Sequence, residues 1–297
     1  MIDISMKKED ITLVVGFFLV VGSIFASIFL HYYFWYSFYV FGASMFFGSL
    51  NYKRRSKSVF SYFLENKWKI FFRVYFLGVL FGLVVDVIYG RRMGDLWHYP
   101  HLQGIKDFIF PVFFYYPFGG LQVYEIFYFC KSLLSKKLNQ KKSFILKNKT
   151  KEIIINSILV LLSLGLIVPL VNYAFNRNFY ANTIMMIVMI FTVFSVDAIL
   201  YKLKKESMFL EFIQGNKLII GTMLFSWFVA VLLTEVPNTF SWEWIYYHIP
   251  FTQFAIFKIN ILIFTFGWFW LVYLPVSYLD LIKHVFKLKE PWMKKVR

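Results

Sequence analysis

The stretch from Leu83 to Phe129 decides the fold, because two apolar runs flank a short polar loop within it. It begins L-V-V-D-V-I-Y-G-R-R-M-G-D-L-W-H-Y-P-H at residues 83–101 and ends P-F-G-G-L-Q-V-Y-E-I-F-Y-F at residues 117–129. Asp86 lies at the end of the first run, and Glu125 lies inside the second. Ionisable side chains at membrane depth are costly and therefore mark candidate functional sites.

The composition of the whole chain indicates a polytopic membrane protein. Hydrophobic residues make up 59% of the 297 residues and charged residues only 16%, whereas soluble domains carry about 25% charged residues. Several apolar runs approach the roughly 20 residues that a helix needs to cross a bilayer. We therefore predict an all-α integral membrane protein. The net charge of +16 does not indicate nucleic-acid binding, because the Lys and Arg residues lie in short loops between apolar runs.

The apolar runs predict eight transmembrane helices. Their expected bounds are residues 11–30, 34–47, 70–89, 108–129, 153–174, 184–201, 218–234 and 257–279. With eight spans, the clusters of Lys and Arg at 51–57, 131–151, 202–205 and 283–297 all fall on one side of the cell membrane. The positive-inside rule makes that side cytoplasmic and places both termini there. Arg91 and Arg92, on the other side, are exceptions.

A shift of the chain by 149 residues brings Asp86 onto Glu235, each at the end of an apolar run. Further matches follow in order: S-V-F-S-Y-F-L at 58–64 with S-M-F-L-E-F-I at 207–213, and Trp97-x-Tyr99 with Trp244-x-Tyr246 after a two-residue gap. Shared order and spacing of this kind predict an internal duplication. The expected units are two four-helix membrane repeats in the same orientation, residues 1–150 and 151–297. In such proteins the site lies between the halves.

Three acids are candidate catalytic residues. Glu125 falls inside its predicted span, where loss of hydration favours a protonated carboxyl group that could donate a proton. The alternative is that Glu125 reaches out of the span or pairs with a structural lysine. Asp86 and Glu235 are expected to face the seam between the repeats as acid and base groups, or else to be solvated at helix ends. Their predicted depth differs from that of Glu125.

Histidines on the outer side raise a second hypothesis. His98, His101 and His248 lie near Asp95 and Glu243 in the sequence, and imidazole with carboxylate is a usual metal-ligand set. The spacing is a weak signal, because aromatic loops at a membrane interface often contain histidine. We therefore expect interfacial histidines, with no metal site and no cofactor.

Aromatic residues make up 23% of the chain. Most are expected to face lipid or to pack between helices. Their number also suits a tunnel for a long apolar ligand, in which ring faces stabilise a cation. The predicted substrate-binding residues are Trp97, Tyr99, Trp244, Tyr246, Tyr128 and Phe129.

The order of these motifs resembles the membrane lycopene cyclase domain family of carotenoid pathways. In that family a span ends in Asp, a W-x-Y-like segment follows, and the next span carries P-x-E-E-x-x-F-F. The matching features here are Asp86, then Trp97-His98-Tyr99, then Glu125-Ile126-Phe127-Tyr128-Phe129. The match covers residues 80–130, with a fainter match at 230–280. The chain has a single Glu where the family has two, and Leu274 and Pro275 where the second half should carry an acid.

The resemblance implies an acid-catalysed cyclisation of a carotenoid or another long isoprenoid, which is an isomerisation. Glu125 would donate the proton, and Asp86 or Glu235 would orient groups or take the proton back. Membrane lipid and an apolar polyene are the expected partners, and a homo-oligomer stays open. The alternatives from the residues themselves are a non-enzymatic transporter or lipid-binding protein, and a membrane scaffold.

Overall fold

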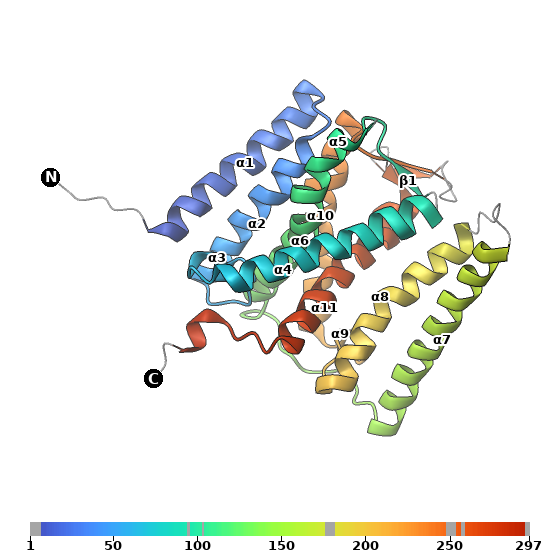
Figure 1. Cartoon of the computed structure of the whole chain (residues 1–297). Coiled ribbons are helices and arrows are strands. Elements are labelled where there is room, and N and C mark those ends of the chain that lie inside the picture. Colours follow the sequence, from blue (N-terminus) through green and yellow to red (C-terminus); the bar gives the residue numbers. More distant parts are fainter. Residues whose placement is uncertain are drawn as a thin grey trace.

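The computed structural model describes residues 7–93, 96–102, 104–175, 182–247, 254–256 and 259–294. These residues form a predominantly helical bundle, and the strands among them form two short antiparallel pairs (Figure 1). The predicted all-α class is confirmed in this respect.

Four helices are long and apolar enough to cross a membrane: Lys8–Leu30, Trp68–Ile88, Lys217–Ser241 and Ile263–Val285. Large apolar side chains on them are exposed, such as Phe18 at 66% and Phe76 at 59%. An apolar surface of this kind is stable against lipid rather than water. The structure therefore supports an integral membrane protein. The other four predicted ranges are also largely helical, and their crossing of a bilayer stays a prediction.

The first half of the chain contains four long helical segments and one short helix. Its elements are α1 (Lys8–Leu30), α2 (Trp35–Lys53), α3 (Ser61–Leu64), α4 (Trp68–Gly82), the π-helical η1 (Leu83–Met93), β1 (Trp97–His98), α5 (Ile105–Phe110), the π-helical η2 (Pro111–Tyr115) and α6 (Tyr116–Leu134). The winding changes at Pro111, where proline removes a backbone donor and π-turns accommodate the lost hydrogen bond.

The second half follows a similar order. Its elements are α7 (Asn148–Phe175), α8 (Asn182–Lys204), α9 (Met208–Ile213), α10 (Lys217–Ser241), β2 (Ile245–Tyr246), β3 (Ala255–Ile256), β4 (Ile259–Asn260), the π-helical η3 (Ile263–Gly267), α11 (Trp268–Val285) and the 3₁₀ turn η4 (Pro291–Lys294). The predicted eighth span began too early. Residues 259–260 pair as β4 with β3, and the helical conformation begins at Ile261, just before the π-helical η3.

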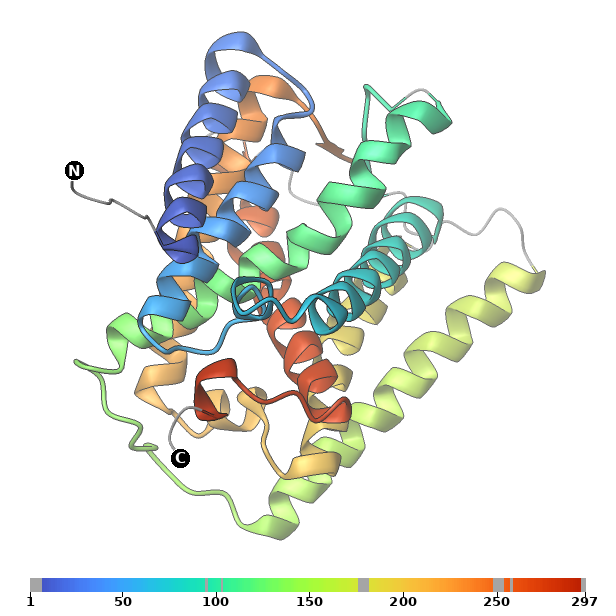
Figure 2. The same cartoon turned by 60° about the vertical axis from the view of Figure 1, so that its left-hand side comes forward.

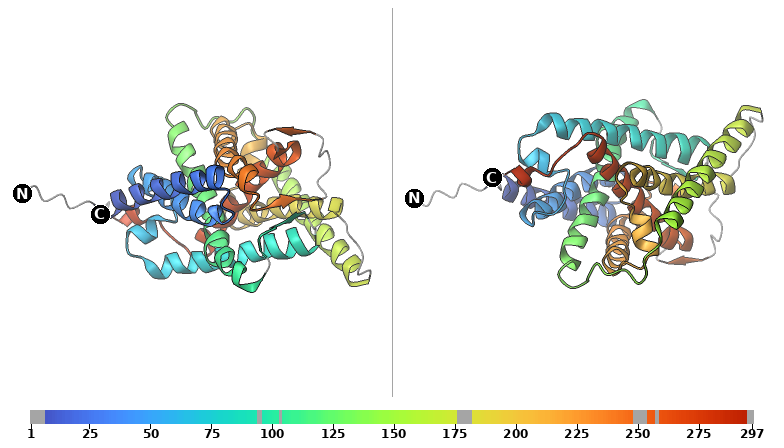
Figure 3. Two further views of the ribbon diagram at one scale, coloured as in Figure 1. Left: turned by 90° about the horizontal axis from the view of Figure 1, so that it is seen from above. Right: turned by 90° about the horizontal axis from the view of Figure 1, so that it is seen from below.

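Helices α6 and α11 lie in the centre of the bundle, where α6 contacts α2, α4, α10 and α11 (Figures 1 and 2). The side chains from Leu121 to Tyr128 are all buried, including the polar Gln122 and Glu125. Helix α7 lies at the edge of the molecule, as the views from above and below show (Figure 3). It packs on α8 through a small separate cluster that includes Ile155 and Tyr201.

Candidate functional site: an aromatic cavity beside Asp86

A cavity of about 150 Å³ lies where α4, η1, α6 and α11 meet the paired strands β1 and β2. Most of its walls are aromatic or small. The lining residues with polar groups are Asp86, Trp97, Tyr99, Tyr116, Trp244, Tyr246 and Trp268, together with Tyr36 and Tyr115. Asp86 is thus the candidate catalytic acid that the structure puts in the wall of this cavity.

Asp86 is buried in η1 and accepts three hydrogen bonds. The indole N–H of Trp97 donates to Oδ1 at 2.5 Å, and the Tyr99 hydroxyl donates to the same oxygen at 2.8 Å. The Tyr116 hydroxyl donates to Oδ2 at 2.5 Å. Gly90 permits this arrangement, because a Cβ atom there would lie 2.0 Å from the Trp97 ring. The W-x-Y segment therefore supplies two of the three donors that fix the carboxyl group.

The surroundings of Tyr99 extend this network. Its hydroxyl lies 2.8 Å from that of Tyr115, which also lines the cavity. The Arg91 guanidinium lies over the Tyr99 ring, 5.4 Å from its centroid. A nearby cation and three donors favour an ionised Asp86, whereas its burial favours the neutral form. A carboxyl group balanced in this way is suited to exchanging a proton with a molecule in the cavity.

Glu235, on α10, has an environment that matches that of Asp86. Its Oε1 accepts from the Tyr246 hydroxyl at 2.5 Å, the Trp268 indole at 2.6 Å and the Trp244 indole at 3.4 Å. All three donors line the cavity, whereas Glu235 lies behind them. Glu235 is therefore connected to the cavity through its donors rather than directly.

The two W-x-Y segments pair with each other. Strands β1 and β2 are antiparallel, with Trp97 opposite Tyr246 and His98 opposite Ile245. Continuing the same register places Tyr99 opposite Trp244. The structure thus brings together the four aromatic residues that the sequence analysis aligned across the two halves.

Glu125 lies elsewhere and is fully buried. Its Oε1 accepts from the Ser58 hydroxyl at 3.0 Å and from the backbone N–H groups of Val59 and Phe60 at 2.8 and 2.9 Å. Its Oε2 accepts from the Asn51 amide at 2.8 Å. Glu125 does not line the aromatic cavity. The structure therefore does not bring it together with Asp86 and Glu235, and gives it a clear role in holding the turn before α3.

Asp197, on α8, is a buried acid that the sequence analysis did not single out. It accepts from the Ser207 hydroxyl and from the backbone N–H groups of Met208 and Phe209 at 3.0 and 3.1 Å. Ser207 is the residue that the 149-residue shift places on Ser58. The S-x-F pattern shared by residues 58–60 and 207–209 was the signal that could have pointed to Asp197, since in both segments a carboxylate accepts from the hydroxyl and N–H groups.

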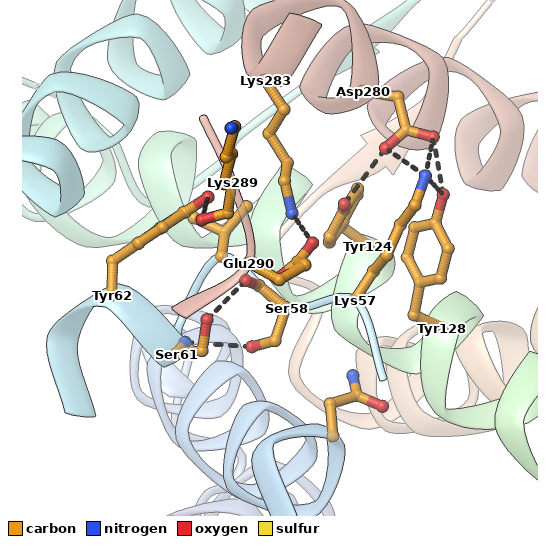
Figure 4. Close-up of polar contacts among 12 residues, drawn as sticks. Lys57, Ser58, Ser61, Tyr62, Tyr124, Tyr128, Asp280, Lys283, Lys289 and Glu290 are labelled. Carbon is orange, nitrogen blue, oxygen red and sulfur yellow. Dashed lines mark hydrogen bonds and ion pairs between the residues drawn. The ribbon is translucent and has the colours of Figure 1, made fainter. Parts of the chain in front are cut away.

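Tyr128 and Phe129 also lie outside the cavity. The Tyr128 hydroxyl donates to Asp280 Oδ2 at 2.6 Å, next to the Lys57 ammonium (Figure 4). Phe129 packs against Phe47 with 5.5 Å between the ring centroids. Neither residue lines the aromatic cavity. The structure therefore does not support the prediction that both contact a substrate bound beside Asp86.

Of the histidines that were predicted on the outer side, His98 and His101 contact different rings. His98 packs edge-on against Tyr247, and His101 stacks on Tyr33. His248 and Asp95 lie outside the described residues. Within the described part of the chain, no three His, Cys, Asp or Glu side chains are grouped as metal ligands.

Glu243, which follows α10, is buried and accepts a hydrogen bond from the Tyr36 backbone N–H at 3.0 Å. Burial raises the pKa of its carboxyl group well above the ordinary value of 4.5. Glu243 is therefore a proton-binding group close to Tyr36 in the cavity wall.

No protein-family model, curated protein or solved structure matches this chain. The resemblance to lycopene cyclases accordingly depends on the motifs quoted above.

Proposed function

We propose that the chain is an eight-span membrane protein made of two four-helix repeats, residues 1–150 and 151–297, with both termini in the cytoplasm. The pairing of β1 with β2 supports the duplication. The register is symmetric about His98 and Ile245, so each Trp faces the Tyr of the other segment. Equivalent segments related by a local two-fold axis pair in this manner. The hydrogen bonds from each W-x-Y segment to Asp86 and Glu235 give further support.

For this protein we propose acid-catalysed cyclisation of the end of a long isoprenoid, such as a carotenoid. The observation that carries the proposal is a buried carboxyl group, Asp86, in the wall of an aromatic cavity. A volume of about 150 Å³ is below the roughly 300–1,000 Å³ of pockets that enclose a drug-sized ligand. The cavity therefore suits the end group of a polyene rather than the whole molecule.

The chemistry needs one proton and no redox partner. A protonated carboxyl group donates its proton to the terminal double bond, which leaves a tertiary carbocation. A neighbouring double bond attacks that cation and forms the ring C–C bond. A base then removes one proton from the ring, so the product is an isomer of the substrate. Asp86 is the acid that reaches the cavity directly, and it can take a proton back once it is ionised.

The walls of the cavity suit a cationic intermediate. The rings of Trp97, Tyr116 and Trp268 line it, and aromatic faces attract a cation by roughly 0.5–2 kcal/mol each. The indole and hydroxyl groups of the three residues are turned to the two carboxylates. Water is the competing nucleophile in such a reaction, and an aromatic wall helps to exclude it.

The test is pigment analysis of cells that accumulate lycopene and express the chain. We expect cyclic carotenes with the unmodified protein and at least a hundredfold less with Asp86→Asn, as for loss of a general acid. Glu206→Gln, at an exposed acid, is the matched control and should retain full activity. Glu125→Gln separates the two candidate donors, since an inactive Glu125 variant beside an active Asp86 variant would return the role to Glu125. Unchanged lycopene with protein present in the membrane would refute lycopene cyclisation.

A further inference from the structure

A second cavity, of about 390 Å³, lies at the lysine-rich end of the bundle and shares no lining residue with the aromatic cavity. It is enclosed by the ends of α6, α8 and α11, by α9 and by the start of α10. The link from α6 to α7 runs past this region along the lower side of the molecule (Figure 2). Residues 131–151 of that segment hold eight lysines and no acid. The most basic segment of the sequence therefore forms part of the cavity wall, through Lys131, Gln140 and Lys142.

Charged residues dominate the lining. The basic members are Lys57, Lys131, Lys142, Lys204 and Lys205, and the acidic members are Asp197, Glu206, Glu211 and Asp280. Asp197 is already occupied by donors from the turn before α9. Three acids thus remain to balance five lysines within the lining.

The remaining ion pairs leave one ammonium group over. Lys142 pairs with Glu211 at 2.6 Å and Lys204 with Glu206 at 2.6 Å. Lys205 pairs at 2.7 Å with Glu152, which lies outside the lining.

Lys57 lies 3.3 Å from Asp280, whose oxygens also accept from the hydroxyls of Tyr124 and Tyr128 (Figure 4). Lys131 makes no ion pair with any described residue, and its ammonium group lies over the Tyr128 ring, 5.7 Å from the ring centroid. The cavity thus contains a partly buried cation that is close to Lys57 and near the carboxylates of Asp280, Glu211 and Glu206, but forms no direct ion pair with a described residue.

A half-buried ammonium group that has no direct ion-pair partner gains free energy when an anion binds beside it. Lysine is a common partner for phosphate, which it binds as a point charge. Basic pockets between membrane helices on the cytoplasmic side bind lipid head groups. The cavity is also large enough for a phosphate group with its substituent. We propose that this cavity binds the phosphate of an anionic lipid, with Lys131 as its main charge partner and Lys57 beside it.

The experiment uses the full chain reconstituted in nanodiscs of phosphatidylcholine, with phosphatidylglycerol added in increasing amounts. Native mass spectrometry counts the retained phosphatidylglycerol. We expect the unmodified protein to retain phosphatidylglycerol in preference to phosphatidylcholine. In Lys131→Gln the affinity for phosphatidylglycerol should fall by about tenfold or more, as for loss of one hydrogen bond between charged groups. Lys136→Gln is the matched control, because Lys136 is exposed on the same segment and does not line the cavity.

A second arm, with inorganic phosphate as competitor, identifies the source of the phosphate. Retention that phosphate does not displace supports a lipid head group, and displacement at millimolar phosphate supports a soluble phosphorylated ligand in the same site. Equal retention by Lys131→Gln, Lys136→Gln and the unmodified protein would overturn the proposal. If Lys131→Gln does not fold, the unmodified protein alone still tests the proposal. Equal retention of phosphatidylcholine and phosphatidylglycerol by the unmodified protein would also overturn the proposal. Neither arm depends on cyclase activity.

Discussion

Replacing Glu125 with alanine removes the acceptor of four buried donors. These are the Asn51 amide, the Ser58 hydroxyl, and the backbone N–H groups of Val59 and Phe60. The two N–H groups are held in the turn before α3 and cannot rotate toward another acceptor. A buried donor left without a partner costs about 1–3 kcal/mol, so these two alone predict a loss of about 2–6 kcal/mol of folding free energy.

Glutamine at the same position separates the hydrogen bonds from the charge. Its side-chain oxygen can still accept from Ser58, Val59 and Phe60, while its amide faces the donating amide of Asn51. One hydrogen bond is lost, and the expected cost is about 1 kcal/mol. Glu125→Gln should therefore lie much closer to the unmodified protein than Glu125→Ala.

Thermal unfolding in a mild detergent, followed by tryptophan fluorescence, measures both variants. At roughly 2–4 °C per kcal/mol, the alanine variant should unfold about 4–24 °C lower and the glutamine variant only about 2–4 °C lower. Glu206→Ala, at an exposed acid, controls for the removal of a carboxylate as such. If Glu125→Ala unfolds at the temperature of the unmodified protein, this carboxylate does not hold the turn, and the reasoning from its four donors fails.

Three further predictions use the same assay. Ser207→Ala removes the hydroxyl that accepts from the Leu210 N–H at the start of α9, and should cost about 0.5–2 kcal/mol; no loss of stability would contradict this role. In Gly90→Ala the new Cβ would lie 2.0 Å from the Trp97 ring and force the ring to move. This should cost about 1–3 kcal/mol of folding free energy and abolish any cyclase activity. Gly104→Ala, at an open position, is the control and should change neither stability nor activity. Burial raises the pKa of Glu243, so its contribution to stability is complete below pH 4.5 and is lost as the pH rises through the folded-state pKa. Glu243→Gln should remove this part of the pH dependence of stability. Parallel stability–pH profiles for Glu243→Gln and the unmodified protein would argue against this role.

Hydropathy alone located several helix boundaries well. The run predicted at 11–30 is a helix at Lys8–Leu30, and the run predicted at 218–234 lies within Lys217–Ser241. The failure at residue 257 has a physical cause. Residues 259–260, inside the predicted range, pair as β4 with β3, and the π-helical η3 follows at Ile263. Hydropathy measures transfer into lipid and carries no information on the hydrogen-bond pattern of the backbone.

The candidate site was predictable only where the 149-residue shift aligned similar segments of the sequence. The alignment of the two W-x-Y segments pointed to residues that meet on paired strands, and it selected Asp86 and Glu235 as their companions. The surroundings of Glu125 were not predictable in this way, because its donors lie 65–74 residues away in the chain. A glutamate inside an apolar run looks the same in the sequence whether it donates a proton to a substrate or accepts hydrogen bonds from a buried turn. Its predicted depth and its polarity therefore could not separate the two roles.

The two halves hold their short helices by the same hydrogen bonds but take the carboxylate from different helices. The Ser58 hydroxyl accepts from the Ser61 N–H, and the Ser207 hydroxyl accepts from the Leu210 N–H, both at 3.0 Å. The Ser58 hydroxyl donates to Glu125, and the Ser207 hydroxyl donates to Asp197. The repeat shift places Asp197 on Gly48.

A Cβ at Gly48 would lie 2.4 Å from that of Phe60, so the first half has no room for an acid on α2 and uses Glu125 on α6 instead. The same shift places Glu125 on Leu274. Position 274 needs no acid, because Asp197 already accepts the hydrogen bonds of the turn before α9. The absence of an acid at this position therefore does not require a loss of catalysis. This comparison favours a structural role for Glu125 and leaves Asp86 as the acid in contact with the cavity.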